Sequence, residues 1–337
     1  MAAQKFMLVA KLLLPDAAPA SSRLLLTFGT RGGAGEGRIT INLLPRTCDL
    51  RRLGVDPADV TQIEAIGEKH GSRLFRVVCG AGSFVLKWFG VPAQAIEVRG
   101  YELLQQHGVP TLPVHGRADN ALLLEDLASS PTWRLAEAAD VERPATGVAI
   151  ADWYRALHAA GRRMLSGPLG APHFLGREPD ALDSASVVEI GQKLGNESDP
   201  VWRLAADHIE ALKSALRSLP ETLNYNDFHW SNLALSRPVG PPLRAIVYDY
   251  HLLGIGPAYS DCRNVCGSLG ERARAAFWEA YGPVHEREAV LDAPVAILYA
   301  LRVAVQMPRL PRWADGSVLQ ARNGELAASL RRALEAL

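Results

Sequence analysis

Apolar positions change their spacing along this chain, from alternation before about residue 130 to helical periodicity after it. Three strand-like runs follow residue 56: VTQIEAI, SRLFRVVC and SFVLKWF. Glycine-containing turns at residues 67–71 and 80–82 separate these runs, which predicts an antiparallel meander. A helix in AQAIEVRGYELLQQHG, with Gly108 as its cap, and two more strands, VPTLPVHGRA and ALLLEDLA, are predicted next. Residues 56–128 are therefore predicted to form a β-rich unit with one helix.

The remaining residues, 129–337, begin with a predicted short linker, SSPTW, and then show mainly helical spacing. Helices are predicted from Pro144 to Gly161 and over PVWRLAADHIEALKSALRSL, which follows Asp199. Two β-like runs, SNLALS and AIVYDYHLL, interrupt the helices and predict an embedded hairpin. Three further helical stretches are predicted from there to the C-terminus.

The first 55 residues are predicted to form a small β appendage. They contain the apolar runs FMLVAKLLL, RLLLTF and RITINLL, and the segment from Gly29 to Gly37 indicates a hairpin loop between the last two. This Gly-rich segment lacks the Gly-Lys-Ser/Thr end of a phosphate-binding P-loop. Because Lys5 and Lys11 interrupt the apolar start, and no run of about 18 apolar residues exists, we expect neither a signal peptide nor a transmembrane helix.

Composition narrows the class of protein. Hydrophobic residues make up 48% and charged residues 21%, which is typical of a globular protein. The 36 basic and 36 acidic residues cancel, so we expect no nucleic-acid and no membrane partner. Four cysteines are too few and too scattered for a disulfide framework, and we interpret Cys262 and Cys266 as small buried thiols. A cytoplasmic location is the simplest expectation.

Lys87 stands in the strand SFVLKWF on the same face as Val85 and Phe89. A buried ammonium needs an anion to offset its desolvation. Glu97, near the start of the following helix, and Glu102 are the candidates for that anion. Taken alone, Lys87 is equally consistent with a lysine whose stem lies on apolar surface and whose ammonium reaches water.

A polar stretch from Asn226 to Asn232 lies between apolar runs and contains Asp227. Asp249 follows within the β-like run AIVYDYHLL, where an unsatisfied carboxylate would be costly. Two carboxylates and an amide oxygen that converge at a hairpin would suit Mg²⁺. For each of these residues alone, turn or capping chemistry is the alternative.

The order of these residues resembles the aminoglycoside-phosphotransferase (APH) and small-molecule kinase family, whose fold is related to that of protein kinases. The resemblance covers roughly residues 60–310. Five segments carry it: EVRGYELLQQHGVPTLPV, ADWYRALHAAG, NDFHWSNLAL, IVYDYHLLG and GPAYSDCRNV. It implies an α+β bilobal protein-kinase-like fold, with the N-lobe over residues 56–128, a mainly helical C-lobe over residues 129–337, and the N-terminal β appendage over residues 1–55.

The resemblance also implies roles for these side chains in phosphoryl transfer from Mg-ATP. Asp227 would be the catalytic residue that accepts or orients the proton of the acceptor hydroxyl. Asn232 and Asp249 would hold Mg²⁺. Lys87 would bind the nucleotide phosphates, and the alignment selects Glu97 rather than Glu102 as its anchor.

The nucleotide itself would lie between the lobes. The resemblance places the turn from Gly67 to Gly71 over the ATP phosphates. It places the hinge at ALLLEDLA, where backbone groups around Glu125, Asp126 and Leu127 would contact the adenine.

Three departures from the family pattern accompany the resemblance. Tyr225 stands where the family usually has histidine, the metal segment reads Asp-Tyr-His rather than Asp-Trp-Glu or the protein-kinase Asp-Phe-Gly, and one extra residue precedes Asp261. All the carboxylates that the family uses are present, so turnover is expected rather than nucleotide binding alone.

The expected acceptor is a hydroxylated small molecule, an aminoglycoside or another antibiotic, with a kinase for choline, homoserine or a sugar as the alternative. Glu271 and Glu279 are candidate contacts for a cationic acceptor, and solvated acids on a helix surface are the simpler interpretation.

Overall fold

The computed structural model describes residues 44–45, 48–69, 71–91, 95–237 and 242–337. Most of the predicted N-terminal appendage, including the segment from Gly29 to Gly37, lies outside the described residues. Residues 48–55, which belong to the same predicted unit, contain a short 3₁₀ helix, Arg51–Leu53, and no strand. Leu50 and Leu53 are buried against the N-lobe sheet, so this part of the chain packs onto the lobe that follows it.

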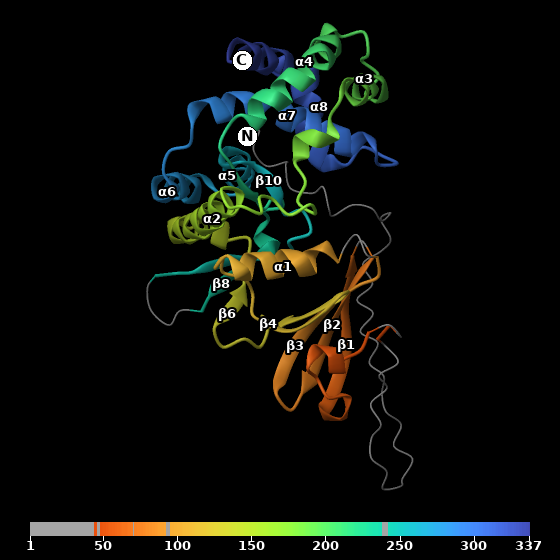
Figure 1. The fold of residues 1–337 in the computed structure, drawn as a ribbon, viewed down its shortest axis with the longest axis vertical. Coiled ribbons are helices and arrows are strands. Elements are labelled where there is room, and N and C mark those ends of the chain that lie inside the picture. The colour runs from red at the N-terminus through yellow and green to blue at the C-terminus, as the bar shows by residue number, and fades with distance from the viewer. Residues whose placement is uncertain (1–43, 46–47, 70, 92–94, 238–241) are drawn as a thin grey trace.

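The N-lobe is a five-stranded antiparallel sheet with one helix, as the sequence predicted (Figure 1). The strand order across the sheet is β1-β2-β3-β5-β4, so the three predicted strands of the meander are neighbours. The elements are β1 (Val60–Lys69), β2 (Ser72–Cys79), β3 (Gly82–Phe89), α1 (Ile96–Gln106), β4 (Val114–Ala118) and β5 (Ala121–Glu125).

Helix α1 ends at the cap that its sequence predicted. Gly108 adopts a left-handed backbone, with φ of 73°, and the N–H of Val109 donates to the carbonyl of Leu104 at 2.9 Å. This 6→1 bond is the Schellman arrangement, which glycine favours because it has no Cβ. The cap turns the chain from α1 into β4.

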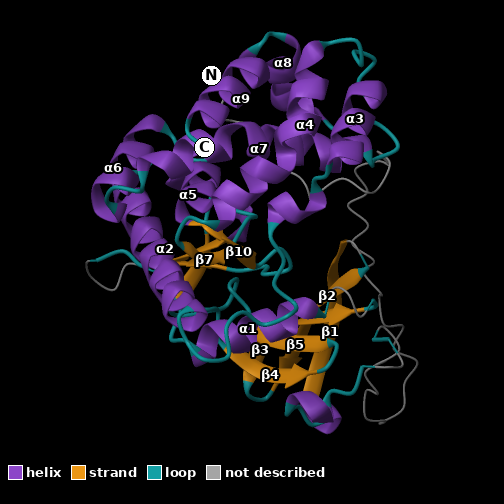
Figure 2. Cartoon of the chain, turned by 45° about the horizontal axis from the view of Figure 1, so that its top comes forward, coloured by secondary structure: helices purple, strands orange, loops and turns teal. Residues whose placement is uncertain are grey.

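The C-lobe is mainly helical, with short strands among its helices (Figure 2). The predicted hairpin is β8 paired with β9, and β6 extends it to three strands, while β7 pairs with β10. The strands are β6 (Trp133–Leu135), β7 (Glu221–Asn224), β8 (Leu233–Ser236), β9 (Ala245–Val247) and β10 (Gly254–Pro257). The helices are α2 (Pro144–Leu165), α3 (Ser184–Lys193), α4 (Pro200–Arg217), α5 (Ala258–Cys266), α6 (Glu271–Tyr281), α7 (Glu286–Val305), α8 (Asp315–Arg322) and α9 (Glu325–Glu335).

Four parts of the C-lobe differ from the prediction. The predicted linker SSPTW runs into strand β6 at Trp133, and α3 and the β7–β10 pair were not predicted. Five helices, α5 to α9, follow β10 where three helical stretches were expected. The sequence of β10, Gly-Ile-Gly-Pro, shows no strand-like apolar run, so only its pairing with β7 reveals it.

The two lobes share one hydrophobic core at α1. Tyr101 of α1 is fully buried, and its ring meets that of Tyr250 edge-on at 4.7 Å between centroids. Gly100 lets the helix approach Tyr250, because a Cβ there would lie 3.3 Å from the tyrosine Cβ. On the outer face of α1, the guanidinium of Arg99 stacks at 4.2 Å over the ring of Phe174, which comes from the C-lobe. Helix α1 is therefore held by both lobes.

The remaining sequence expectations about the core are consistent with the structure. Cys262 and Cys266 are buried free thiols, and burial raises the pKa of Cys266 to about 12.

Among the described residues, no helix is both long and apolar enough to span a membrane.

Helix α2 packs closely against its neighbours through glycine. A Cβ on Gly161 would lie 2.1 Å from the backbone nitrogen of Leu223 in β7, and a Cβ on Gly147 would lie 2.0 Å from the carbonyl oxygen of Ala273 in α6. Both contacts are with backbone, which cannot move aside as a side chain can.

We predict that Gly161→Ala lowers the free energy of unfolding by about 1–3 kcal/mol, because the added methyl group separates α2 from β7. Urea denaturation followed by circular dichroism measures this. Gly80→Ala is the matched control, since a Cβ at that position meets nothing within 4 Å, and it should change stability by less than about 0.5 kcal/mol. Equal effects of the two substitutions would contradict the packing argument.

Candidate functional site

Lys87 lies between two carboxylates that come from different parts of the fold. Its Nζ is 2.5 Å from Glu97 Oε2, in the first turn of α1, and 2.8 Å from Asp249 Oδ1, in the C-lobe. The Lys87 side chain is 12% exposed and that of Glu97 is 1% exposed. Burial alone would lower the pKa of Lys87, but the charges of Asp249 and Glu97 outweigh it and raise this pKa, so the lysine stays cationic.

The choice between the two acidic residues of α1 is settled by geometry. Glu102 lies on the other side of the helix, with Oε1 3.9 Å from Nη1 of Arg117 on β4, and its side chain is half exposed. Glu97 is the residue that reaches Lys87, as the family alignment predicted.

The polar stretch that contains Asp227 connects β7 to β8 and is held by a buried carboxylate. Asp261, in the first turn of α5, is fully buried and accepts hydrogen bonds from the backbone N–H groups of Tyr225 at 2.7 Å and Asn226 at 2.9 Å. The side chain of Asn264 adds a bond to the carbonyl of Asn226 at 2.8 Å. Asn226 has φ of 65°, so this loop needs such support. The extra residue before Asp261 does not remove that support.

Tyr225, the residue that departs from the family's histidine, also holds the loop. Its ring is fully buried, and its hydroxyl donates to the backbone carbonyl of Tyr248 at 2.5 Å. Tyr248 in turn donates its hydroxyl to the carbonyl of Ser231 at 2.6 Å. Burial raises the pKa of Tyr225, so the hydroxyl remains a neutral donor. These bonds connect the Asp227 loop directly to the segment that carries Asp249.

Asp227 and Asn232 are in contact. The amide nitrogen of Asn232 donates to Asp227 Oδ2 at 3.1 Å and to the Asp227 carbonyl at 3.2 Å. With its nitrogen bound in this way, the amide oxygen is the atom of Asn232 that can bind a cation. The sequence predicted these two residues as neighbours at a hairpin, and the structure brings them together with Asp249.

His251 belongs to the same cluster, although the sequence did not single it out as a site residue. Asp227, Asp249 and His251 each offer a ligand atom, and these atoms all lie within 4.8 Å of one another. The Nδ1 atom of His251 is 3.0 Å from Asp249 Oδ1, whereas its Nε2 is buried without a hydrogen-bond partner among the described residues. Asp249 has φ of 73°, in the left-handed region. The only sequence signal for His251 was the departure of Asp-Tyr-His from the family pattern.

This cluster has the chemistry of a divalent-cation site. Two carboxylates and an amide oxygen are ligands that Mg²⁺ prefers, and imidazole nitrogen is a further metal ligand. The Nδ1 atom of His251 lies 3.0 Å from Asp249 Oδ1, so a nitrogen donor is present beside these oxygens. The donor set therefore fits a divalent cation.

The predicted hinge, ALLLEDLA, contains β5 and the three residues after it, and the side chains around Glu125 to Leu127 stabilise the fold. The buried carboxylate of Asp126 accepts bonds from Ser83 at 2.6 Å and Arg76 at 2.8 Å. Burial raises the pKa of Asp126, but these bonds, a bond from the Ala128 N–H and the charge of Arg76 together lower it. The carboxylate of Glu125 lies 2.9 Å from Nε2 of His115. The backbone N–H of Glu125 donates to the Pro113 carbonyl. Leu127 is buried.

The glycine turn between β1 and β2 is shorter than predicted. Gly67 lies within β1, opposite Leu74 and next to a register shift, so it is a strand residue at a β-bulge rather than part of the turn. Gly71 has φ of 78°, and its carbonyl accepts a bond from the N–H of Gly90 at 2.9 Å. This bond connects the hairpin to the end of β3, near Lys87.

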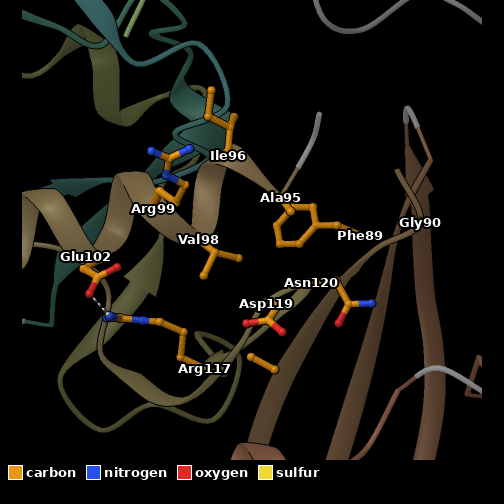
Figure 3. Close-up of a pocket in the computed structure, with 11 residues that line it drawn as sticks. Phe89, Gly90, Ala95, Ile96, Val98, Arg99, Glu102, Arg117, Asp119 and Asn120 are labelled. Carbon is orange, nitrogen blue, oxygen red and sulfur yellow. Dashed lines mark ion pairs between the residues drawn. The ribbon is translucent and has the colours of Figure 1, made fainter. Parts of the chain in front are cut away.

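A cavity of ≈ 830 Å³ lies elsewhere, between α1 and the turn that joins β4 to β5 (Figure 3). Phe89, Arg99, Arg117 and Asp119 are among the residues that line it. None of Lys87, Asp227 and Asp249 does, so this cavity is separate from the charged cluster. Glu271 and Glu279 are exposed on α6, which packs against α2, as expected for solvated surface acids.

Comparisons with known proteins agree with this geometry. A choline/ethanolamine kinase family protein from Mesorhizobium loti has a TM-score of 0.54 and 16% identity, over 84% of this chain and 97% of its own. A protein described provisionally as an aminoglycoside phosphotransferase, from Ralstonia eutropha, has a TM-score of 0.52 and 13% identity, over 85% and 96%. An ethanolamine kinase from Plasmodium vivax has a TM-score of 0.50 and 13% identity, over 83% of this chain and 87% of its own.

These likenesses establish the bilobal protein-kinase-like fold. No curated protein sequence matches the chain. The sequence model of the phosphotransferase enzyme family, APH, matches residues 62–291, which is more than half of the chain and includes every residue of the charged cluster. The chain therefore belongs to the APH phosphotransferase enzyme family, and it is a small-molecule kinase that transfers phosphate to a hydroxyl group.

Proposed function

We propose that this kinase uses ATP and Mg²⁺ and that its reaction takes place at the cluster around Lys87. The observation that carries the proposal is the position of the Lys87 ammonium between Glu97 and Asp249, with Asp227 in the same cluster. One cation for the phosphates and a group of oxygen ligands for a metal are the two requirements of phosphoryl transfer, which depends on positioning and charge neutralisation.

Asn232 and Asp249 are the residues that would hold the Mg²⁺. A bound Mg²⁺ would offset the charge of the phosphate oxygens during transfer. Lys87 would bind the same phosphates, and Glu97 would hold its ammonium in place from α1. Gly67 and Gly71, in the β1–β2 hairpin, would lie over the phosphates.

The adenine would bind at the hinge after β5. The N–H of Glu125 already donates to the Pro113 carbonyl. The carbonyl of Asp126 already accepts bonds from the N–H groups of Ser129 and Ser130. We therefore assign the adenine contacts to the other backbone groups of the segment from Glu125 to Leu127. The Asp126 carboxylate would fix the shape of this segment through Ser83 and Arg76.

Asp227 would act on the acceptor. Its carboxylate would accept the hydroxyl proton as the acceptor oxygen forms a bond to the γ-phosphorus and the bond from that phosphorus to the β–γ bridging oxygen breaks, with ADP leaving. Asn232 would hold the Asp227 carboxylate in place through its amide N–H. Asp261 would fix the loop from below through the backbone of Tyr225 and Asn226.

The acceptor that we propose is an aminoglycoside or another hydroxylated antibiotic. A metabolic alcohol, such as choline, ethanolamine, homoserine or a sugar, is the second candidate. The similarity in fold to the Ralstonia eutropha protein supports the first candidate, and the similarity to the Mesorhizobium loti and Plasmodium vivax proteins supports the second.

We predict that the wild-type protein transfers labelled phosphate from ATP to one class of acceptor in a panel of aminoglycosides, other hydroxylated antibiotics and small alcohols. Asp227→Asn should lower the transfer rate by about a hundredfold or more, because the amide cannot accept the proton, and should leave ATP affinity nearly unchanged. Asp207→Asn, an exposed change on α4, is the control and should keep full activity. Undiminished transfer by Asp227→Asn would exclude Asp227 as the base.

For Asp249→Ala we predict the loss of the Mg²⁺-dependent part of ATP binding. Affinity measured by calorimetry in the presence of Mg²⁺ should fall by about tenfold or more, towards the value with EDTA, because a metal ligand is missing. Asp152→Ala removes an exposed carboxylate from α2 and should bind as the wild type does. If Asp249→Ala keeps the full response to Mg²⁺, its metal role is wrong.

A further inference from the structure

His251 is a site residue that the family pattern does not explain. Its Nδ1 lies 3.0 Å from Asp249 Oδ1, and it shares a cluster no wider than 4.8 Å with Asp249 and Asp227. The side chain is 24% exposed, so the ring lies in the wall of the cluster rather than on the open surface. Of the described residues, these three form the group of histidine, cysteine and acidic side chains close enough to bind one metal ion.

The 3.0 Å distance between His251 Nδ1 and Asp249 Oδ1 fits two arrangements. Nδ1 can donate a hydrogen bond to the carboxylate. Alternatively, both atoms can bind one cation, because adjacent ligands of an octahedral ion at about 2.1 Å are about 3.0 Å apart. Two lone pairs that face each other at this distance repel, so without a cation Nδ1 must carry the ring proton. If a cation bound there, Nδ1 would be its ligand and the ring proton would lie on Nε2.

The type of donor atom affects which cation the site prefers. A site with oxygen ligands alone suits Mg²⁺, whereas an imidazole nitrogen favours first-row transition ions. The family pattern has glutamate two residues after the metal-binding aspartate, an oxygen donor, in the place of His251. This chain therefore replaces an oxygen donor with a nitrogen donor, which Mn²⁺ and the later first-row ions accept more readily than Mg²⁺ does.

We propose that His251 is a nitrogen ligand of the divalent cation in this cluster and that it shifts the preference of the site from Mg²⁺ towards Mn²⁺. The inference rests on the proposed function, because it uses the same metal site. The alternative is that His251 only positions Asp249, as a hydrogen-bond donor without contact to the metal.

Pulsed electron paramagnetic resonance of bound Mn²⁺ distinguishes the two roles without any turnover. Mn²⁺ is added to the protein with a non-hydrolysable ATP analogue, and the modulation from ¹⁴N nuclei is recorded. The adenine also contains nitrogen, so the experiment is repeated on protein whose histidines carry ¹⁵N. We expect a ¹⁴N signal in the wild type that is replaced by a ¹⁵N signal after this labelling.

The variants identify the histidine. His251→Glu and His251→Gln should lose the signal, whereas His229→Gln, a histidine outside the three-residue cluster, should keep it. Titrations of Mg²⁺ and Mn²⁺ in the presence of the analogue give the ratio of the two affinities. This ratio should move towards Mg²⁺ by about tenfold in His251→Glu, which retains a ligand but offers oxygen.

The outcomes separate this inference from the proposed function. Bound Mn²⁺ without a histidine signal, or an unchanged ratio in His251→Glu, would show that His251 is not a ligand and leave the kinase site intact. If Mn²⁺ and the analogue do not bind at all, the metal site and this inference fail together.

Discussion

The arrangement of the charged cluster depends on keeping one ammonium group charged while it is almost removed from water. Lys87 is 12% exposed, and an isolated ammonium at such a position would lose most of its hydration. Glu97 and Asp249 offset this loss, one from α1 in the N-lobe and the other from the C-lobe. The ion pairs therefore fix α1 relative to both β3 and the metal segment, and they connect the two lobes where a nucleotide would bind.

The residues around Asp249 and Asp227 also hold the charged cluster in place. Asp261 binds two backbone N–H groups of the Asp227 loop, and Tyr225 connects that loop to Tyr248. Both residues bind backbone groups, so each helps to determine where a neighbouring carboxylate lies. Glu97 and Asp249 share the single lysine Lys87, and Asp227 adds a further carboxylate near Asp249, which leaves an excess of negative charge for a divalent cation to balance.

Much of the N-lobe and of the charged cluster was predictable from the sequence. Lys87 in an apolar strand, the helix that carries Glu97, and the order of Asp227, Asn232 and Asp249 each show in local pattern or spacing. Comparison with the family selected Glu97 over Glu102, and the 2.5 Å contact to Lys87 bears this out. Local periodicity and the order of motifs are properties of the sequence itself, so they can be recognised without a structure.

What the sequence did not reveal depends on contacts between distant segments. Strands β7 and β10 are four residues each and exist because they pair with each other. Tyr225 and the extra residue before Asp261 were noted as departures, but their effect depends on which backbone groups they reach in space. The same is true of His251, whose place beside Asp249 follows from the left-handed turn at Asp249 rather than from any motif.

The most direct test of this account is a double-mutant cycle on Lys87 and Glu97, with ATP affinity measured by calorimetry in the presence of Mg²⁺. The variants are Lys87→Met, Glu97→Gln and the two combined. If Glu97 acts by holding the Lys87 ammonium, Glu97→Gln weakens binding when Lys87 is present and adds no further loss to Lys87→Met. Additive losses would show that the two side chains act independently and would contradict the view that their ion pair forms the phosphate site.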